Sequence, residues 1–429
     1  MTTLLILFGV FFVLLLVGTP ILFALMGAAL VVLHQIDFLS SQLVLQRIYA
    51  GLDSFPMLAI PFFMAAGALM ERGGISRRLV NFSSYLVGWI RGGLGHVAVI
   101  ASTIFAGISG SAVADTTAIG STMIPMMKRR GFDPSFAASV VAASGVNGPI
   151  IPPSIPLVLY GVISGVSIGA LFMGGIVPGL MMTIGLMALI YLKASRGDWE
   201  VETEPFSLSG LFRSFISALG ALVMPIIIVG GILGGVFTAT EAAVVATVYA
   251  LVAGLFIYRE LSFSQLPALF QGAALNTAMV MVIVGVANLV GYVLTIEQIP
   301  LALSDWFSDH ITDAFILLLV INLLLLVAGC FLDGGSAIIV FTPVLLPVVQ
   351  AFGIDPVFFG VMMTVNLMIG TITPPVGLSL YIAAGIANIT ILQICRAILP
   401  FLALHLAVLF LITLFPELVL AIPSRLFDY

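Results

Sequence analysis

Polar side chains that could hold an ion gather in two short stretches of an otherwise apolar chain. One stretch runs from Ser109 to Asp115 and the other from Asp333 to Ser336, and each is followed by a proline-containing break. Hydroxyl, amide and freed backbone carbonyl oxygens suit a sodium ion, whereas N–H groups at helix starts suit an anion. These residue types predict neighbouring sites for a cation and for an anionic ligand.

We predict two sodium sites, one where each polar stretch meets the break that follows it. Proline lacks an N–H, so carbonyl groups one turn earlier stay unpaired and available as ligands. The predicted sodium ligands are Ser109, Ser111, Asn147 and Gly148 in one site, and Asp333, Ser336, Thr371 and Thr373 in the other. The predicted substrate contacts are Asp115, Thr116, Ser144, Asn366, Pro152 and Pro374.

Structural roles are the alternative for each of these residues. A serine or threonine in a membrane helix often bonds only to the preceding turn, and an aspartate can cap a helix. A carboxylate inside a membrane is costly, which favours a functional role for Asp115 and Asp333. No transition-metal site is expected, because the histidines and cysteines show no ligand spacing: His34, His96, His310, His405, Cys330 and Cys395.

The polar stretches and breaks belong to an internal duplication. A shift of 222 positions, without gaps, superimposes the turn and the break of one copy on those of the other. It carries Gly131, Asp133, Pro134, Gly148, Pro152 and Pro153 onto Gly353, Asp355, Pro356, Gly370, Pro374 and Pro375. A repeat at fixed offset indicates two copies of one structural unit.

Composition assigns the chain to the lipid bilayer. Apolar residues make up 61% of the 429 residues and charged residues 8%, so a soluble fold could not cover its surface with polar groups. Apolar stretches of about twenty residues recur without alternating ten-residue patterns, which predicts helices rather than barrel strands. The run from Thr2 to Val17 lacks a basic start and a cleavage site, so we expect a retained first span.

The predicted fold is an all-α polytopic membrane protein with two repeats, each with about five transmembrane helices and one re-entrant hairpin. The first repeat covers 1–205, with scaffold helices in 1–70, a hairpin at about 92–127 and a broken helix at 133–170. The second covers 206–429, with scaffold helices in 215–296, a hairpin at about 315–349 and a broken helix at 356–386. The acidic segment Asp198 to Glu204 is the expected linker.

Charge predicts that the repeats are inverted relative to each other. Lys128, Arg129 and Arg130 correspond to Gln350, Ala351 and Phe352 in the second copy, so basic residues change ends. Lysine and arginine are enriched on the cytoplasmic side of membrane proteins, and same-side repeats would have kept them. Inverted repeats with broken helices are typical of secondary transporters. Both termini are then expected in the periplasm.

Four motifs resemble those of the large membrane subunit of TRAP transporters. They are Ser109 to Asp115, Asn147-Gly-Pro-Ile-Ile-Pro-Pro-Ser154, Asp333 to Ser336 and Gly370-Thr-Ile-Thr-Pro-Pro375. The resemblance covers essentially the whole chain. It implies a bacterial inner-membrane symporter of the ion transporter superfamily that imports an organic acid with sodium by an elevator motion. Sialic acid is the favoured substrate and a C4-dicarboxylate the next. Na⁺ is the expected coupling ion, and no cofactor is expected.

The same resemblance implies two protein partners. One is a soluble periplasmic substrate-binding protein, and the other is a small four-helix membrane subunit, expected as a separate polypeptide. The surrounding lipid bilayer is the remaining expected contact, and no nucleic acid is expected.

Three other functions are alternatives to this interpretation. A self-sufficient sodium/dicarboxylate carrier of the related inverted-repeat superfamily is the alternative, but such carriers tend to have Ser-Asn-Thr at the hairpin tips. An intramembrane enzyme is not expected, because the chain lacks HExxH, GxGD aspartates and a Ser/His pairing. A channel is less expected, because paired hairpins suit alternating access better than a continuous pore.

Overall fold

The computed structural model of the chain describes residues 2–35, 41–195, 206–311 and 313–427, and every regular element in these ranges is helical. Seven of the described helices are long and apolar enough to cross a membrane, or up to nine if each of two bent pairs counts as one span. The predicted all-helical membrane class is therefore confirmed. The predicted acidic linker, 198–204, lies outside the described residues.

The first half of the chain forms ten α-helices and one short 3₁₀ turn. They are α1 (Thr2–Leu16), α2 (Ile21–Gln35), α3 (Ser41–Leu52), η1 (Phe55–Leu58), α4 (Ala59–Arg72), α5 (Ile75–Val87), α6 (Gly93–Ser109), α7 (Ala112–Arg129), α8 (Pro134–Gly145), α9 (Ile155–Ser164) and α10 (Ile168–Ser195).

The second half continues with a similar series. It consists of α11 (Leu208–Leu233), α12 (Ala239–Val252), η2 (Ala253–Ile257), η3 (Phe263–Gln265), α13 (Leu266–Ile296), α14 (Ile299–His310), α15 (Ala314–Phe331), α16 (Gly334–Ala351), α17 (Pro356–Gly370), α18 (Leu378–Ala387), α19 (Ile391–Ala397), α20 (Leu399–Leu414), α21 (Glu417–Leu420) and α22 (Pro423–Leu426).

The helices of the hairpins and breaks recur at the offset found in the sequence. Moving the first residues of α6, α7, α8 and α9 by 222 positions places them within one residue of the starts of α15, α16, α17 and α18. Both breaks contain a cis peptide bond, between Pro152 and Pro153 and between Pro374 and Pro375. The two halves thus share one local plan around the predicted site.

One scaffold element differs between the halves. In the first half, a short 3₁₀ turn separates α3, which carries Arg47, from α4. The corresponding stretch of the second half is one unbroken helix, α13. Pro56 interrupts the first copy because it lacks an N–H and clashes with the preceding turn, and its counterpart Ala278 continues the helix.

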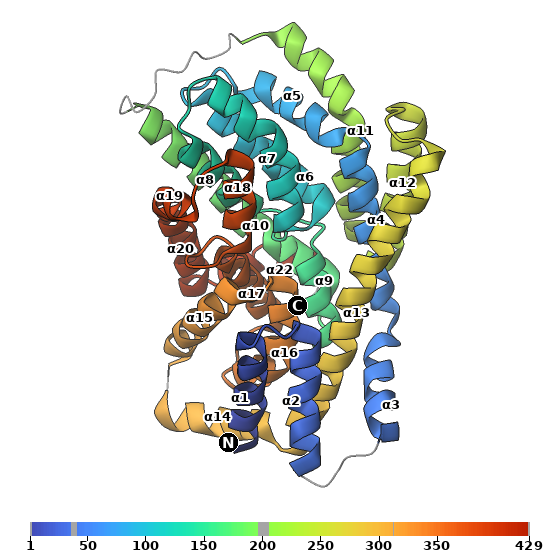
Figure 1. Cartoon of the computed structure of the whole chain (residues 1–429), viewed down its shortest axis with the longest axis vertical. Helices are drawn as coiled ribbons and strands as arrows, with labels where there is room; N and C mark the ends of the chain where they lie inside the picture. The colour runs from blue at the N-terminus through green and yellow to red at the C-terminus, as the bar shows by residue number, and fades with distance from the viewer. Residues whose placement is uncertain (1, 36–40, 196–205, 312, 428–429) are drawn as a thin grey trace.

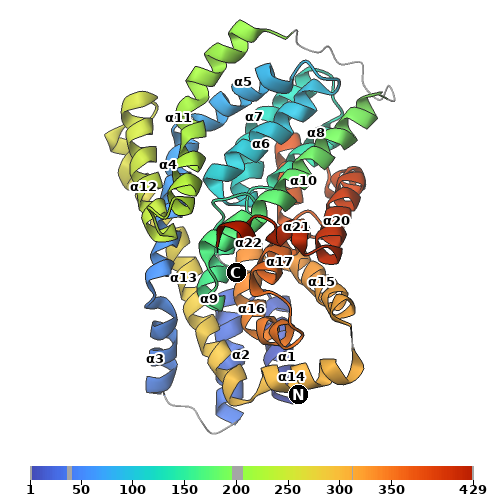
Figure 2. The same ribbon diagram turned by 180° about the vertical axis from the view of Figure 1, so that it is seen from behind.

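The two hairpins reach the middle of the molecule from different parts of it. Figure 1 shows α6 and α7 in the upper part and α15 and α16 in the lower part, and Figure 2 shows the same arrangement from behind. The break helices connect the halves, because α18 packs against α7 and α8 while α9 packs against α16. Every residue of α17 after Pro356 is buried, so the core lies among these helices.

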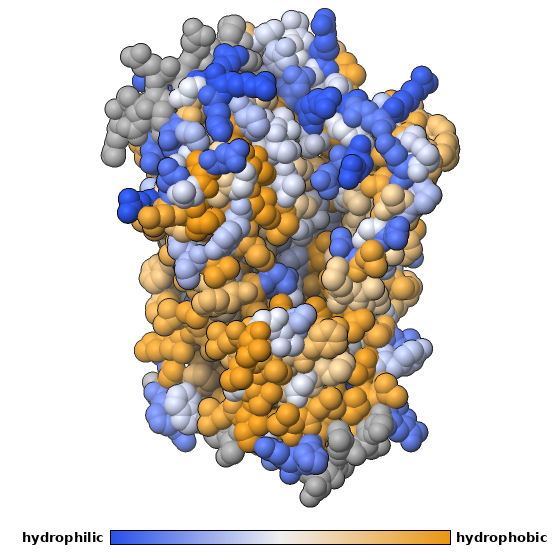
Figure 3. Space-filling model, in the orientation of Figure 1, coloured by the Kyte–Doolittle hydropathy of each residue, from blue (hydrophilic) through white to orange (hydrophobic). Residues whose placement is uncertain are grey.

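The surface matches a protein that lies in a bilayer. In Figure 3 hydrophobic residues cover a broad band across the visible face of the molecule, and hydrophilic residues gather at the upper end and along the lower edge. Many large apolar side chains are exposed, among them Leu208, Ile226 and Leu323. In water such a surface would be unfavourable, whereas lipid tails cover it without cost.

Inversion of the repeats stays a prediction that sidedness can test. We expect Arg129→Cys to be labelled only from the cytoplasm and Asp309→Cys, at the end of α14, only from the periplasm, because basic residues stay inside. Membrane-impermeant maleimide labelling of intact cells measures this, with lysed cells as the control. Periplasmic labelling at position 129 in a functional protein would contradict inversion.

The crossing of α15 and α17 predicts a stability effect. A Cβ on Gly370 would lie 2.6 Å from the Cα of Gly329, so Gly370→Ala must push two backbones apart. We expect a loss of about 1–3 kcal/mol in stability and a lower melting temperature in detergent. Gly385→Ala on α18 is the matched control, since a Cβ there meets nothing within 4 Å. Equal melting temperatures for both variants would contradict this packing.

Candidate functional site

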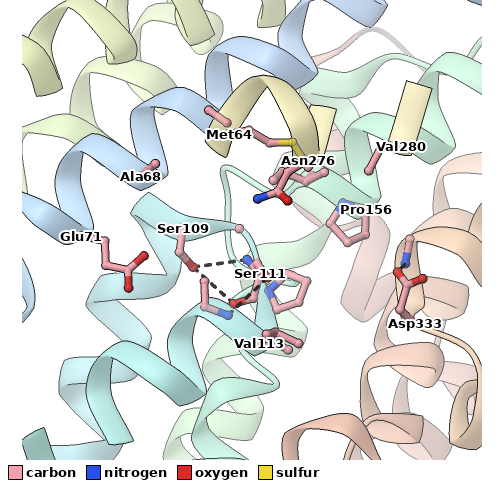
Figure 4. A pocket seen from close by; sticks show the side chains of 18 of the residues that line it. Met64, Ala68, Glu71, Ser109, Ser111, Val113, Pro156, Asn276, Val280 and Asp333 are labelled. Atoms are coloured by element: carbon pink, nitrogen blue, oxygen red, sulfur yellow. Dashed lines mark hydrogen bonds between the residues drawn. The ribbon is translucent and has the colours of Figure 1, made fainter. Parts of the chain in front are cut away.

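A cavity of about 460 Å³ lies where the two hairpin tips approach each other. The tip of the first hairpin contributes Ser109 to Ala114, and that of the second contributes Asp333 to Gly335. Figure 4 shows Ser109 and Ser111 on one side, Asp333 on another, and Asn276 of α13 across from them. Residues more than two hundred positions apart thus share one cavity.

Four helices begin at this cavity. Its lining includes the first residues of α7, α9, α16 and α18, at Ala112, Ile155, Gly334 and Leu378. The first N–H groups of a helix have no partner within the helix, and the helix dipole places partial positive charge there. Four such ends around one space favour a bound anion, although no lysine lines it and its one arginine, Arg72, lies at its margin on α4.

The first tip holds a buried carboxylate. Asp115, on α7, is fully buried, and one of its oxygens accepts a hydrogen bond from the Ser109 hydroxyl. Its other oxygen, Oδ2, has no hydrogen-bond partner among the described residues and lies against Gly148. Ser111 caps α7 by accepting from the Ala114 N–H at 3.4 Å. An unpaired carboxylate oxygen at this depth favours a cation.

Two more unpaired oxygens lie near this junction, one from the first break and one from α7. Asn147 is fully buried and donates to Thr183 on α10 at 3.1 Å, but its own Oδ1 has no partner among the described residues. Thr116 Oγ1 is likewise unpartnered within the described chain and lies against Gly145. The structure therefore brings the predicted residues of the first site together.

The second tip is built differently. Asp333 is exposed and caps α16, since its Oδ1 accepts from the N–H groups of Gly335 at 3.0 Å and Ser336 at 3.2 Å. Ser336 itself is buried. The carboxylate of Asp333 thus has both a structural role and direct access to the cavity.

The second break closes onto its own hairpin. Gly377 N–H donates to the carbonyl of Cys330, at the end of α15, at 3.4 Å. The carbonyl oxygens of Thr371 and Thr373 both lie beside Gly377. Their hydroxyls donate to backbone carbonyls of the preceding turn, at 2.7 and 2.8 Å. Carbonyl groups rather than hydroxyls are therefore the oxygens that this break presents.

Several predicted substrate contacts lie outside the cavity. Ser144 is fully buried and donates to the Val140 carbonyl at 2.6 Å. Asn366 is fully buried and donates to Asn322 Oδ1 at 2.7 Å. Pro152 is buried and Pro374 half-buried, and neither lines the cavity, nor do Asp115 and Thr116 beneath the first tip. A substrate role for these six residues stays a prediction.

The cavity has a second wall, whose residues are not among those predicted from the sequence to bind sodium or substrate. This wall includes Met64, Glu71 and Arg72 of α4 and Asn276 of α13. Figure 4 shows Met64 and Asn276 across the cavity from Ser111. In the sequence, Asn276 stands out only as an amide within the long apolar run of α13. No local pattern predicts that α4 lies near the hairpin tips. In the described part of the chain no cluster of three or more His, Cys, Asp or Glu side chains could hold a transition metal.

The helical membrane fold and the cavity between the paired hairpin tips are those of a membrane transport protein. The chain belongs to the tripartite ATP-independent periplasmic transporter family, as its DctM component, because the model of that family matches residues 8–418.

Curated relatives agree with this assignment. The isethionate TRAP transporter permease protein DctMQ of Oleidesulfovibrio alaskensis is 44% identical over 96% of this chain, which spans 65% of that relative's length. The sialic acid TRAP transporter large permease protein SiaM of Vibrio cholerae is 39% identical over 97% of each chain. The C4-dicarboxylate TRAP transporter large permease protein DctM of Rhodobacter capsulatus is 37% identical over 98% of this chain and 99% of its own.

A solved structure has a similar fold. The YdaH transporter of Alcanivorax borkumensis, described as having an unusual topology, aligns over 87% of each chain with a TM-score of 0.65 and 14% identity. At this identity the likeness concerns the fold alone.

The family makes the chain a multi-pass subunit of an organic acid transporter in the bacterial inner membrane, not an enzyme, and implies a small membrane subunit and a periplasmic binding protein.

Proposed function

We propose that this chain couples sodium entry to the import of an organic acid anion that a periplasmic binding protein delivers. The observation that carries the proposal is the cavity between the tips, where four helix starts meet beside buried, unpartnered oxygens. Sialic acid is the first substrate to test and a C4-dicarboxylate the next. Isethionate is the third candidate substrate, because one relative is named as an isethionate transporter permease.

The substrate anion occupies the cavity itself. Partial positive charge from the starts of α7, α9, α16 and α18 offsets the charge of its carboxylate or sulfonate group. Asn276 and the Ser111 hydroxyl supply further polar contacts at the edge of the cavity. A relatively small number of polar groups on an apolar wall is the usual composition of a small-molecule site.

The first sodium ion binds beneath the first tip. Asp115 Oδ2, Thr116 Oγ1 and Asn147 Oδ1 are the oxygens that support this placement, because each is buried without a partner among the described residues. A sodium ion offsets the cost of leaving such oxygens unpaired. Ser109 and Ser111 hold the tip in place, and Gly148 leaves room for the Asp115 carboxylate.

The second sodium ion binds where Gly377 meets Cys330. The carbonyl oxygens of Thr371 and Thr373 support this placement, with Asp333 and Ser336 at the adjoining tip. This site lacks a buried carboxylate, so it is the weaker of the two.

Transport proceeds by an elevator motion. The tips and breaks pack into one body through the contacts of α18 with α7 and of α9 with α16, while α4 and α13 form the opposite wall. Because the tip body carries the ion and anion ligands, sliding it along that wall moves the site across the membrane. A self-sufficient carrier remains the alternative that reconstitution tests.

We expect removal of ligand oxygens to weaken sodium coupling. Thr116→Ala and Asn147→Ala should each raise the sodium concentration for half-maximal uptake about tenfold, corresponding to about 1.4 kcal/mol. Uptake of radiolabelled substrate into proteoliposomes, at graded sodium concentrations, measures this. Thr117→Ala is the matched control, since its exposed hydroxyl only donates to the Val113 carbonyl. Unchanged sodium dependence in both variants would refute these ligands.

We also expect transport to require all three components. The chain reconstituted alone should give no sodium-driven uptake of N-acetylneuraminate, succinate or isethionate. Addition of the small membrane subunit and the periplasmic binding protein should restore it for one of these anions. Robust uptake by the chain alone would favour the self-sufficient carrier.

A further inference from the structure

A second cavity, of about 620 Å³, lies apart from the tips. Its lining comes from α3 and the segment after it, α9, α13, α14 and α16, and includes Arg47, Ser54, Asn288 and Tyr292. None of the residues predicted to bind sodium or substrate lines it. The function proposed above leaves this cavity unexplained.

The two cavities follow one another along the same three helices. On α13, residues from Ala268 to Val280 line the first cavity and residues from Val284 to Thr295 line the second. The starts of α9 and α16 likewise face the first cavity, and their later turns face the second. Asn276 and Asn288 are about 18 Å apart along the helix axis, more than half the thickness of a bilayer core. The cavities therefore lie toward opposite ends of a membrane-spanning helix.

The internal repeat relates the two cavities to each other. Three residues of α3 and Ser54, which follows α3, line the second cavity, and a shift of 222 positions carries them onto four residues of α13 that line the first. The pairs are Arg47 with Leu269, Ala50 with Gly272, Gly51 with Ala273, and Ser54 with Asn276. The same helical face thus borders a cavity in each half, but only the first half places a cation there.

Arg47 is held in a position suited to bind an anion. Its guanidinium lies 3.8 Å from the centre of the Tyr292 ring, and the side chain is half-buried. No acidic residue is among those that line the cavity, and no carboxylate of the described residues forms an ion pair with Arg47. Stacking fixes the guanidinium plane and leaves its edge donors available for a carboxylate. A partly buried arginine without an acidic partner among the described residues is a candidate for binding an anion.

We propose that Arg47, with Asn288 and Ser54, forms a carboxylate-binding site that receives the organic acid on the periplasmic side, before it reaches the hairpin tips. The proposal rests on the transport function above and on the expected sidedness, in which the end of α4 at Arg72 faces the cytoplasm. Positive charge in a cleft raises the local concentration of an anionic substrate. The first cavity, with Glu71 at its margin, is the corresponding exit.

The charge of this cavity can be measured without knowing the substrate. Asn288→Cys is introduced into the full chain with Cys330→Ala and Cys395→Ala, and is reacted with anionic sulfonatoethyl and cationic trimethylammonioethyl methanethiosulfonate. We expect Arg47→Gln to lower the anionic-to-cationic rate ratio about fivefold, as removal of a nearby charge requires. Arg47→Lys should retain the ratio. Arg213→Gln, which removes an exposed charge from α11, is the matched control and should not change it.

Two further measurements complete the test. In intact cells both reagents should reach Asn288→Cys from outside, and millimolar succinate, N-acetylneuraminate or isethionate should slow its labelling in proteoliposomes. An unchanged ratio in Arg47→Gln, or labelling from the cytoplasm alone, overturns the proposal. So does labelling slowed by phosphatidylglycerol but by none of the three anions, which assigns the site to a lipid phosphate. Sodium-driven uptake by the unmodified three-component system is scored separately, so the function above can stand or fall independently.

Discussion

The structure depends on one constraint: backbone groups freed at a break cannot face lipid. Each unpaired amide or carbonyl in hydrocarbon costs several kcal/mol, so irregular backbone persists only against protein or a bound ligand. Each break accordingly closes on the hairpin of its own repeat, Gly110 against the Pro153 carbonyl and Gly377 onto Cys330. Close contacts of this kind need glycine, and the breaks, the tips and the cavity form one connected unit.

The two halves share this plan but divide the chemistry unequally. Asp115 lies buried beneath the first tip, and its counterpart in the second half is Ala337. The second tip instead has Asp333, an exposed helix cap whose counterpart is Ser111. A duplicated backbone therefore supports one site with a buried carboxylate and another that relies on carbonyl groups.

The break helices make the halves a single mechanical unit. Because α18 packs against the first hairpin and α9 against the second, neither hairpin can move without the break helix of the other repeat. The wall formed by α4 and α13 has fewer such connections to the tips, and its helix α13 borders both cavities, at Asn276 and at Asn288. A body that slides along this wall would pass from one cavity toward the other.

The sequence alone determined the helical membrane class, the repeat at 222 positions, both hairpins and both breaks, because apolar runs, prolines and glycines act locally. It also indicated the residues of the first junction, since Asp115 and Asn147 are conspicuous in an apolar chain. Only the tertiary structure decided that Ser144 and Asn366 lie outside the cavity, that α4 and α13 complete it, and that Arg47 faces a second one. Those outcomes depend on which helices pack together across hundreds of residues, and no local pattern encodes that choice.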